Sequence, residues 1–244
     1  MGTDLALLVQ SLAERANPEP QTGRLRLPTE RELVASLDVS RGALREQLSM
    51  LEILGFLDRT QGRGSYLDVP DASFIQLYFD LCRQLGHLSD DQFTSAREML
   101  EVSVAEAAAR MATADDVDAL RGLVDEMVQA SAAGEDDRAL EADLEFHRRL
   151  YRIVDNPIFT LLHDGLSHAL RSEVVERRRR AVEREPLQTG KTRVIDTVHY
   201  GIVEAIGERD GEGARIAMRR HFTVWSSLTA ASPDAGTPDG KPRR

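Results

Sequence analysis

The sequence predicts a mainly α-helical protein in which β-structure is confined to a short segment near the N-terminus. Leu, Ala, Arg and Glu dominate the composition and aromatic residues make up only 5% of 244 residues, which favours helices over sheets. From Asp71 onward, apolar residues recur with helical spacing and nothing alternates as a strand does. Two short β-prone pieces occur before that point, on either side of QGRG at residues 61–64.

The charge balance does not by itself indicate a nucleic-acid partner. The formal net charge is −10, whereas residues 24–68 contain seven Arg and seven acidic residues and are therefore neutral. Because the distribution of charge matters more than its sum, a DNA-binding hypothesis has to rest on a local pattern.

Cysteine usage and hydropathy indicate a protein of the cytoplasm. The single Cys82 excludes an internal disulfide, and its apolar neighbours predict a thiol packed in the core. No segment approaches the roughly 18 apolar residues that span a bilayer, so no membrane partner is expected. The N-terminus lacks a basic region and carries Asp4, which argues against a signal peptide.

Residues 29–55 have the pattern of two helices joined by a three-residue turn. Thr29 followed by Glu32 predicts a capping box, and Ser40 after the break at residues 38–40 predicts the N-cap of the next helix. That helix places Leu44, Leu48 and Leu51 on one face and ends at Gly55. This is a helix-turn-helix pattern, whose second helix enters the major groove of DNA. With a first helix at about 4–16, the segment holds three helices.

A glycine-rich hairpin follows the second helix. The β-prone pieces around QGRG predict a wing whose tip carries Arg63. Glycines let such a tip approach a DNA backbone or minor groove closely.

The segment from Leu27 to Leu67 resembles the DNA-binding domain of the GntR family of bacterial transcription regulators. The resemblance is carried by LPTEREL at 27–33, DVSRGALREQL at 38–48 and the glycines of the wing. It implies DNA contacts at Arg31, Ser40, Arg41, Arg45 and Gly62. Arg31 and Ser40 would hold phosphates, whereas Arg41 and Arg45 could reach guanine. The segment ANPEPQTGRLR before this match is longer and richer in proline than in the family, which leaves the placement of the first helix open.

The remaining chain predicts an all-α antiparallel bundle. Breakers separate helical patterns at about 71–85, 90–111, 114–133, 136–154, 157–182, 191–208 and 211–230. We therefore expect a DNA-binding domain at 1–70, a linker helix within 71–89, a helical domain at 90–230 and a disordered polar tail at 231–244.

Three of these helices carry side chains that could bind a metal ion. Asp143 and His147 are one turn apart on the same helix face, and His199 and His221 lie on two later helices. Imidazole with carboxylate suits zinc, nickel, iron or manganese. Each residue alone is more often an ordinary core or surface residue than a ligand. His163 and His168 are expected at the surface.

The helical region resembles the FCD domain of the FadR branch of this family. The matching features are R-x-x-x-E at Arg97 and Glu101, D-x-x-x-H at Asp143 and His147, and the motifs that contain His199 and His221. The resemblance implies that Asp143, His147, His199 and His221 bind a divalent metal, with zinc the first expectation. It also implies a small organic-acid effector, with Arg97 as a candidate pocket residue; an ion pair between Arg97 and Glu101 is the equal alternative.

Taken together, the sequence predicts a homodimeric, ligand-responsive repressor that binds operator DNA and is not an enzyme. Dimerisation is expected because two recognition helices have to meet two half-sites. Two alternatives are a metal-dependent hydrolase using the same His/Asp site and a regulator in which the metal is only structural.

Overall fold

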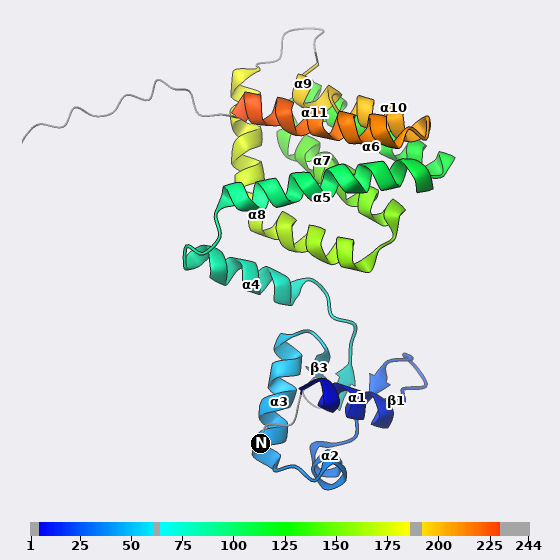
Figure 1. Ribbon diagram of the computed structural model, residues 1–244, viewed down its shortest axis with the longest axis vertical. Helices are drawn as coiled ribbons and strands as arrows, with labels where there is room; N and C mark the ends of the chain where they lie inside the picture. The colour runs from blue at the N-terminus through cyan, green and yellow to red at the C-terminus, as the bar shows by residue number, and fades with distance from the viewer. Residues whose placement is uncertain (1–4, 61–63, 186–191, 230–244) are drawn as a thin grey trace, which may run out of the picture. The chain divides into compact units, whose positions relative to one another are not determined.

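A computed structural model describes residues 5–60, 64–185 and 192–229 (Figure 1). The chain divides into two compact units, Met1–His87 and Leu88–Arg244. Gly62 and Arg63 of the predicted wing tip, and the predicted tail, lie outside the described residues. The predicted fold class is confirmed, with a small winged helical unit followed by an all-helical unit.

The N-terminal unit contains the predicted helix-turn-helix. Its helices are α1 (Leu5–Arg15), α2 (Glu30–Leu37), α3 (Arg41–Ile53) and α4 (Ser73–Gln84). The first three helices bury their apolar faces in a shared leucine core, which leaves the polar faces of α2 and α3 at the surface. This core consists of Leu8, Leu12, Leu27, Leu33, Leu44, Leu48, Leu51 and Leu57.

A four-stranded antiparallel sheet in the order β1-β2-β4-β3 covers part of this unit. The wing strands β3 (Leu57–Thr60) and β4 (Gly64–Leu67) pair as predicted, with Asp58 opposite Tyr66. The additional strands β1 (Asn17–Pro18) and β2 (Leu25–Arg26) were not predicted. They form because β2 pairs with β4, so the proline-rich insertion extends the wing sheet.

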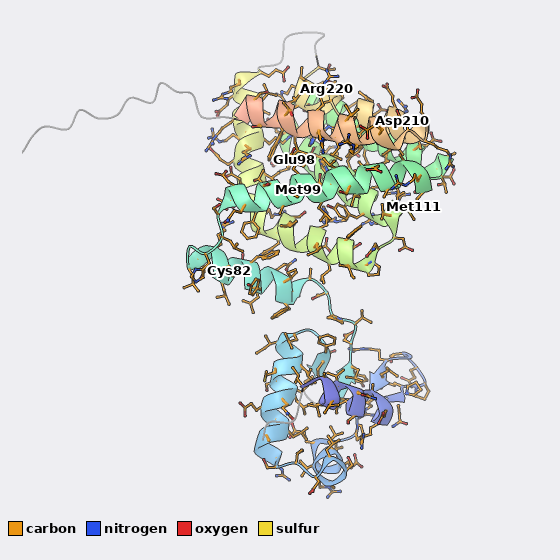
Figure 2. All side chains as sticks on the ribbon, in the orientation of Figure 1. Cys82, Glu98, Met99, Met111, Asp210 and Arg220 are labelled. Atoms are coloured by element: carbon orange, nitrogen blue, oxygen red, sulfur yellow. The ribbon has the colours of Figure 1, made fainter. Side chains whose placement is uncertain are left out.

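Helix α4 differs from the expectation for Cys82. None of its residues is buried, and Cys82, labelled in Figure 2, is only partly covered. The prediction of a core thiol was therefore wrong. Apolar side chains of this helix, including Phe74, Tyr78 and Leu81, are exposed in the described structure.

The C-terminal unit is a bundle of helices whose limits agree closely with the sequence pattern. They are α5 (Asp90–Met111), α6 (Ala114–Ala133), α7 (Asp136–Val154), α8 (Pro157–Arg184), α9 (Val194–Thr197), α10 (Tyr200–Gly207) and α11 (Gly211–Thr229). Side-chain caps begin several of them, with Ser89, Thr113 and Asn156 as N-caps. The one clear difference is that the predicted helix at 191–208 is interrupted at Val198 and His199.

The core of the bundle lies between α5, α6, α7, α10 and α11. Helix α5 runs beside α11 and also packs on α7, and α6 lies along α7 (Figure 1). Small residues such as Ala105, Ala108 and Ala109 allow α5 to approach its neighbours closely, while Met99 and Met111 are exposed on its outer side (Figure 2). Within the described residues, no helix has the length and apolar character needed to cross a membrane.

Candidate DNA-binding surface and candidate metal centre

The helix-turn-helix is fixed by the caps that the sequence predicted. The Thr29 hydroxyl accepts a hydrogen bond from the Glu32 amide at 3.4 Å, and the Thr29 amide donates to the Glu32 carboxylate at 2.8 Å. Asp38 ends α2 in a left-handed conformation, with φ of 52°. The Ser40 hydroxyl then accepts from the Ala43 amide at 3.2 Å and starts α3. These caps fix where α2 begins and ends and where α3 begins.

The predicted DNA-contacting side chains that the structure describes lie on the surface. Arg31, Ser40, Arg41 and Arg45 are all exposed, and the last three stand in the first turns of α3. Exposed cations at the beginning of a second helix can reach phosphates and base edges. Gly62 and Arg63 belong to the undescribed wing tip.

The sequence did not predict the ion pairs that join α2, α3 and the wing strand β3. Nε of Arg45 donates to Glu30 at 2.7 Å. Arg59 on β3 donates to Glu52 at 2.6 Å and to Ser49 at 2.9 Å, both on α3. These contacts connect the start of α2, helix α3 and the wing strand β3, and they give Arg45 of α3 a defined acidic neighbour.

The four predicted metal ligands meet inside the helical unit. Asp143 and His147 come from α7, His199 from the turn before α10, and His221 from α11. One potential ligand atom of each lies within 4.8 Å of those of the other three. Ligands bound at about 2.0–2.2 Å are at most about 4.4 Å apart, so small side-chain movements would suffice to hold one ion.

His147 is oriented by a buried ion pair on α5. Its Nδ1 lies 2.6 Å from Oε2 of Glu101, and the other oxygen of Glu101 accepts from Nε of Arg97 at 2.7 Å. Burial alone would raise the pKa of Glu101, but the charges of Arg97 and His147 hold it well below its usual range. An ionised Glu101 favours the tautomer of His147 that carries its proton on Nδ1, which leaves Nε2 free to bind a metal.

His199 is oriented by its own backbone turn. Its Nδ1 lies 2.9 Å from the carbonyl oxygen of Asp196, and the interruption between α9 and α10 makes this contact possible. Arg178 of α8 donates to the Asp196 carboxylate at 2.8 Å, and both side chains are buried. The turn that carries His199 is therefore tied to α8, and Nε2 of His199 points to Asp143 at 3.1 Å.

The electrostatics of the cluster fit a metal ion. Burial alone would raise the pKa of Asp143, but the close contact with His199 and the nearby charges of His147, His199 and Arg178 hold it far below its usual range. Burial, together with the charges of His199 and His147, holds the pKa of His221 well below its ordinary value. An ionised carboxylate and a neutral imidazole are the forms that bind metals.

Several nitrogens of the cluster also lack protein partners. Both ring nitrogens of His147, Nε2 of His199 and Nδ1 of His221 are buried and form no aligned hydrogen bond within the described part of the chain, although Nδ1 of His147 lies 2.6 Å from Glu101. Since buried polar atoms are nearly always satisfied, this arrangement fits a site that takes a ligand.

His163 was expected at the surface and is buried instead, whereas His168 is exposed as expected. The ring of His163 lies 4.3 Å from that of Tyr151, centre to centre. Burial lowers the pKa of His163 to about 4. A neutral His163 therefore forms part of the packed wall behind Glu101.

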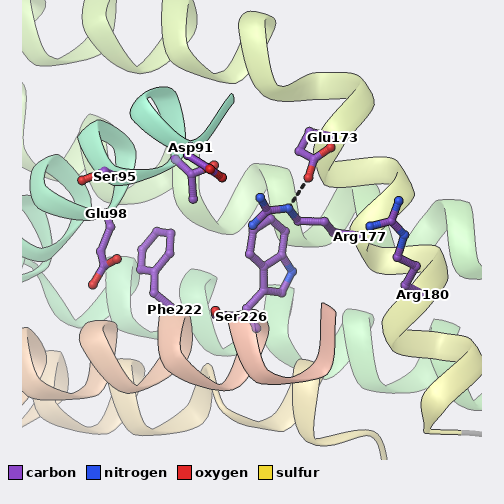
Figure 3. Close-up of a pocket in the computed structure, with 10 residues that line it drawn as sticks. Asp91, Ser95, Glu98, Glu173, Arg177, Arg180, Phe222 and Ser226 are labelled. Carbon is purple, nitrogen blue, oxygen red and sulfur yellow. Dashed lines mark hydrogen bonds and ion pairs between the residues drawn. The ribbon is translucent and has the colours of Figure 1, made fainter. Parts of the chain in front are cut away.

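A separate pocket of ≈ 390 Å³ lies between α5, α8 and α11. Figure 3 shows Phe222 and Arg177 among its lining residues, with Arg177 bonded to Glu173. The guanidinium of Arg177 lies 5.1 Å from the centre of the Trp225 ring. None of the four predicted metal ligands lines this pocket. Arg180 pairs with Glu176 at 2.9 Å, so both cations of the pocket already have carboxylate partners.

A winged helix-turn-helix with exposed arginines, in one chain with a separate helical unit, defines a DNA-binding transcription regulator. The family model "Bacterial regulatory proteins, gntR family" matches residues 23–67, and "FCD domain" matches residues 92–224. The chain belongs to this family: it is a GntR-family regulator with an FCD domain.

Relatives support the same assignment. The chain is 30% identical over 213 residues to the HTH-type transcriptional repressor NanR of Citrobacter rodentium, covering 83% of this chain and 77% of that protein. It is 29% identical over 191 residues to the HTH-type transcriptional regulator LutR of Bacillus subtilis, covering 78% and 85%. The solved structure of Streptococcus agalactiae GntR aligns with a TM-score of 0.60 and 26% identity, covering 91% of this chain and 97% of that one. The protein is a regulator rather than an enzyme, as predicted.

Proposed function

We propose that this protein is a cytoplasmic, homodimeric repressor of the FadR branch whose affinity for operator DNA changes when it binds a small organic acid. In this proposal the helical domain binds a divalent metal through Asp143, His147, His199 and His221, with zinc as the first candidate. The effector carboxylate completes the metal's coordination. The similarity to the HTH-type transcriptional repressor NanR supports the repressor assignment.

The convergence of the four ligands is the observation that carries the proposal. Three helical segments that are distant in sequence bring one carboxylate and three imidazoles to one point. Supporting contacts fix two of the rings through Nδ1, at Glu101 and at the Asp196 carbonyl. A metal with open positions would supply a Lewis-acidic point that binds a carboxylate oxygen.

Arg97 remains the candidate partner for the rest of the effector. Its side chain is 6% exposed and its Nε is engaged by Glu101. The guanidinium has four further N–H donors, so pairing with Glu101 leaves room for a second anionic partner. The role of Arg97 as a fixed structural cation is the alternative that the same contacts support.

The DNA-binding half of the proposal rests on the surface of α3. Arg41 and Arg45 read base edges, Arg31 and Ser40 hold phosphates, and the wing residues Gly62 and Arg63 approach the backbone. Residues 71–89 connect the two domains. Effector binding changes the spacing between the DNA-binding domains of the two protomers, each of which contacts one half-site. An effector acts only through different affinity for the two arrangements.

A structural metal is the second candidate function of the cluster. The ligands join α7, α10 and α11, and an ion shared by three segments would hold the bundle together. In that case metal removal would lower the stability of the bundle and no organic acid would act through the site.

Metal content tests the site directly. We expect the purified chain, reconstituted with zinc and freed of excess ion, to hold about one ion per chain by elemental analysis. The variant His199→Ala should hold much less, whereas His168→Ala, which changes an exposed histidine of α8, should be unchanged. Full occupancy in His199→Ala would remove His199 from the ligand set.

A further inference from the structure

Glu30, the first residue of α2, faces an arginine of the recognition helix. Nε of Arg45 donates to Oε2 of Glu30 at 2.7 Å. The other oxygen, Oε1, lies 3.9 Å from Nη1 of Arg59 on the wing strand β3. Glu30 thus stands between an arginine of α3 and an arginine of the wing.

Arg59 and Arg45 differ in whether their terminal amino groups are available to bind DNA. Arg59 is tied to α3 through Glu52 and Ser49. Arg45 is 63% exposed, and within the described residues its terminal amino groups have no hydrogen-bond partner. Because Glu30 engages only Nε, the two terminal amino groups remain free to form the bidentate contact that reads guanine O6 and N7.

We propose that Glu30 is a specificity-determining residue of the DNA-binding surface, which acts by positioning Arg45. It holds Nε so that the terminal amino groups face the bases, and its negative charge opposes binding to phosphates of any sequence. The inference rests on the proposed DNA contact of Arg45 and extends it to a residue that touches no base.

The two effects are distinct and can be measured separately. Holding the side chain reduces the conformational freedom that base contact would otherwise remove. A carboxylate close to DNA disfavours every sequence equally through repulsion from phosphates. The first effect raises the ratio of specific to non-specific affinity, whereas the second lowers both affinities alike and leaves that ratio unchanged. The alternative is that Glu30 only complements the positive N-terminal end of the α2 dipole. In that case Glu30→Gln would change the stability of the domain and leave DNA binding unchanged.

The test compares four full-length proteins and one control. These are the wild type, Glu30→Gln, Arg45→Ala, the double variant, and Glu46→Gln. Glu46→Gln is the matched control because it removes the same charge next to Arg45 on α3. Glu46 is exposed and has no ion pair among the described residues. The probes are a duplex pool with a randomised core, sequenced after selection, and one duplex of mixed sequence titrated at several salt concentrations.

We expect Arg45→Ala to lower the enrichment of guanine at one position of each half-site by roughly 5- to 150-fold. Glu30→Gln should lower it by at least about threefold and raise the affinity for the mixed-sequence duplex by about two- to fivefold. Glu46→Gln should raise that affinity to a similar extent without changing base preference. In the Arg45→Ala background, Glu30→Gln should cause no further loss of preference.

Three results would overturn the inference. One is unchanged guanine enrichment in Glu30→Gln with melting temperature and fold preserved. The second is an equal loss of enrichment in Glu46→Gln. The third is a further loss of enrichment when Glu30→Gln is added to Arg45→Ala. If Arg45→Ala itself leaves the selected sequence unaltered, the proposed contact of Arg45 is wrong and the inference falls with it; if only Glu30→Gln is silent, the contact stands and the inference alone fails.

Discussion

Oε2 of Glu101 on α5 lies 2.6 Å from Nδ1 of His147 on α7, and neither side chain is more than 1% exposed. This pair links the framework of the bundle to the candidate metal centre. Arg97 fixes Glu101 from the other side at 2.7 Å. The chain Arg97–Glu101–His147 therefore sets which nitrogen of His147 faces the other ligands.

Removing the charge of Glu101 should weaken metal binding without removing a ligand. We expect Glu101→Gln to raise the metal dissociation constant by about 10- to 100-fold, because supporting partners of metal-bound histidines typically contribute that much. Competition with a chromophoric chelator measures it, after circular dichroism has shown that the variant folds. Glu98→Gln, on the same helix but lining the separate pocket, is the control and should bind as the wild type does.

His163 should give the helical unit a specific sensitivity to acid. Its pKa is lowered by burial to about 4, so the unfolded chain takes up a proton between pH 6.5 and 4 that the folded chain does not. The unfolded state binds more protons in this window, and the free energy of unfolding therefore falls as pH falls. Between pH 7.5 and 5 this residue should account for about 2 kcal/mol.

Urea unfolding of chelator-treated protein checks this, followed by the fluorescence of Trp225, the single tryptophan. The variant His163→Leu should lose about 2 kcal/mol less than the wild type over the same pH range. An identical loss in the two proteins would show that His163 does not titrate as its burial predicts.

Ser40 should contribute to both folding and DNA binding. Its hydroxyl caps α3, so Ser40→Ala should lower the stability of α3 by about 1 kcal/mol, measured by hydrogen exchange of the amides of this helix. Because Ser40 is a proposed phosphate contact, Ser40→Ala should also weaken DNA binding, and by a similar factor for every DNA sequence. Ser36→Ala, within α2, is the comparison and should leave DNA affinity unchanged. Altered base preference in Ser40→Ala would contradict the phosphate role.

Helix limits were predictable because breakers and caps mark them. Thr113, Gly134 and Asn156 stand at helix ends in both the pattern and the structure, and local chemistry suffices to place such positions. The interruption at His199 carries no glycine or proline and was missed. It depends on tertiary packing of the Asp196 turn against Arg178 of α8, which no local pattern contains.

The sequence allowed the candidate metal ligands to be predicted, but not the residues that orient these ligands. The family resemblance supplied Asp143, His147, His199 and His221, and the structure brings them together. Glu101 was visible only as a partner of Arg97, because its second contact, with His147, joins two helices. The burial of His163 and the pairing of Arg45 with Glu30 were missed for the same reason: a polar residue's environment is set by its neighbours in space.

The most direct test of the account is a thermal-shift screen of small organic acids on metal-loaded and chelator-treated protein. Hydroxy acids, dicarboxylic acids and sugar acids form the panel. The account predicts that at least one acid raises the melting temperature only when metal is present; at about 100 times its dissociation constant, a ligand adds about 2.7 kcal/mol, a shift of roughly 5 to 10 °C. Equal shifts in both preparations, or no shift from any acid while chelation alone lowers the melting temperature, would contradict sensing through the metal.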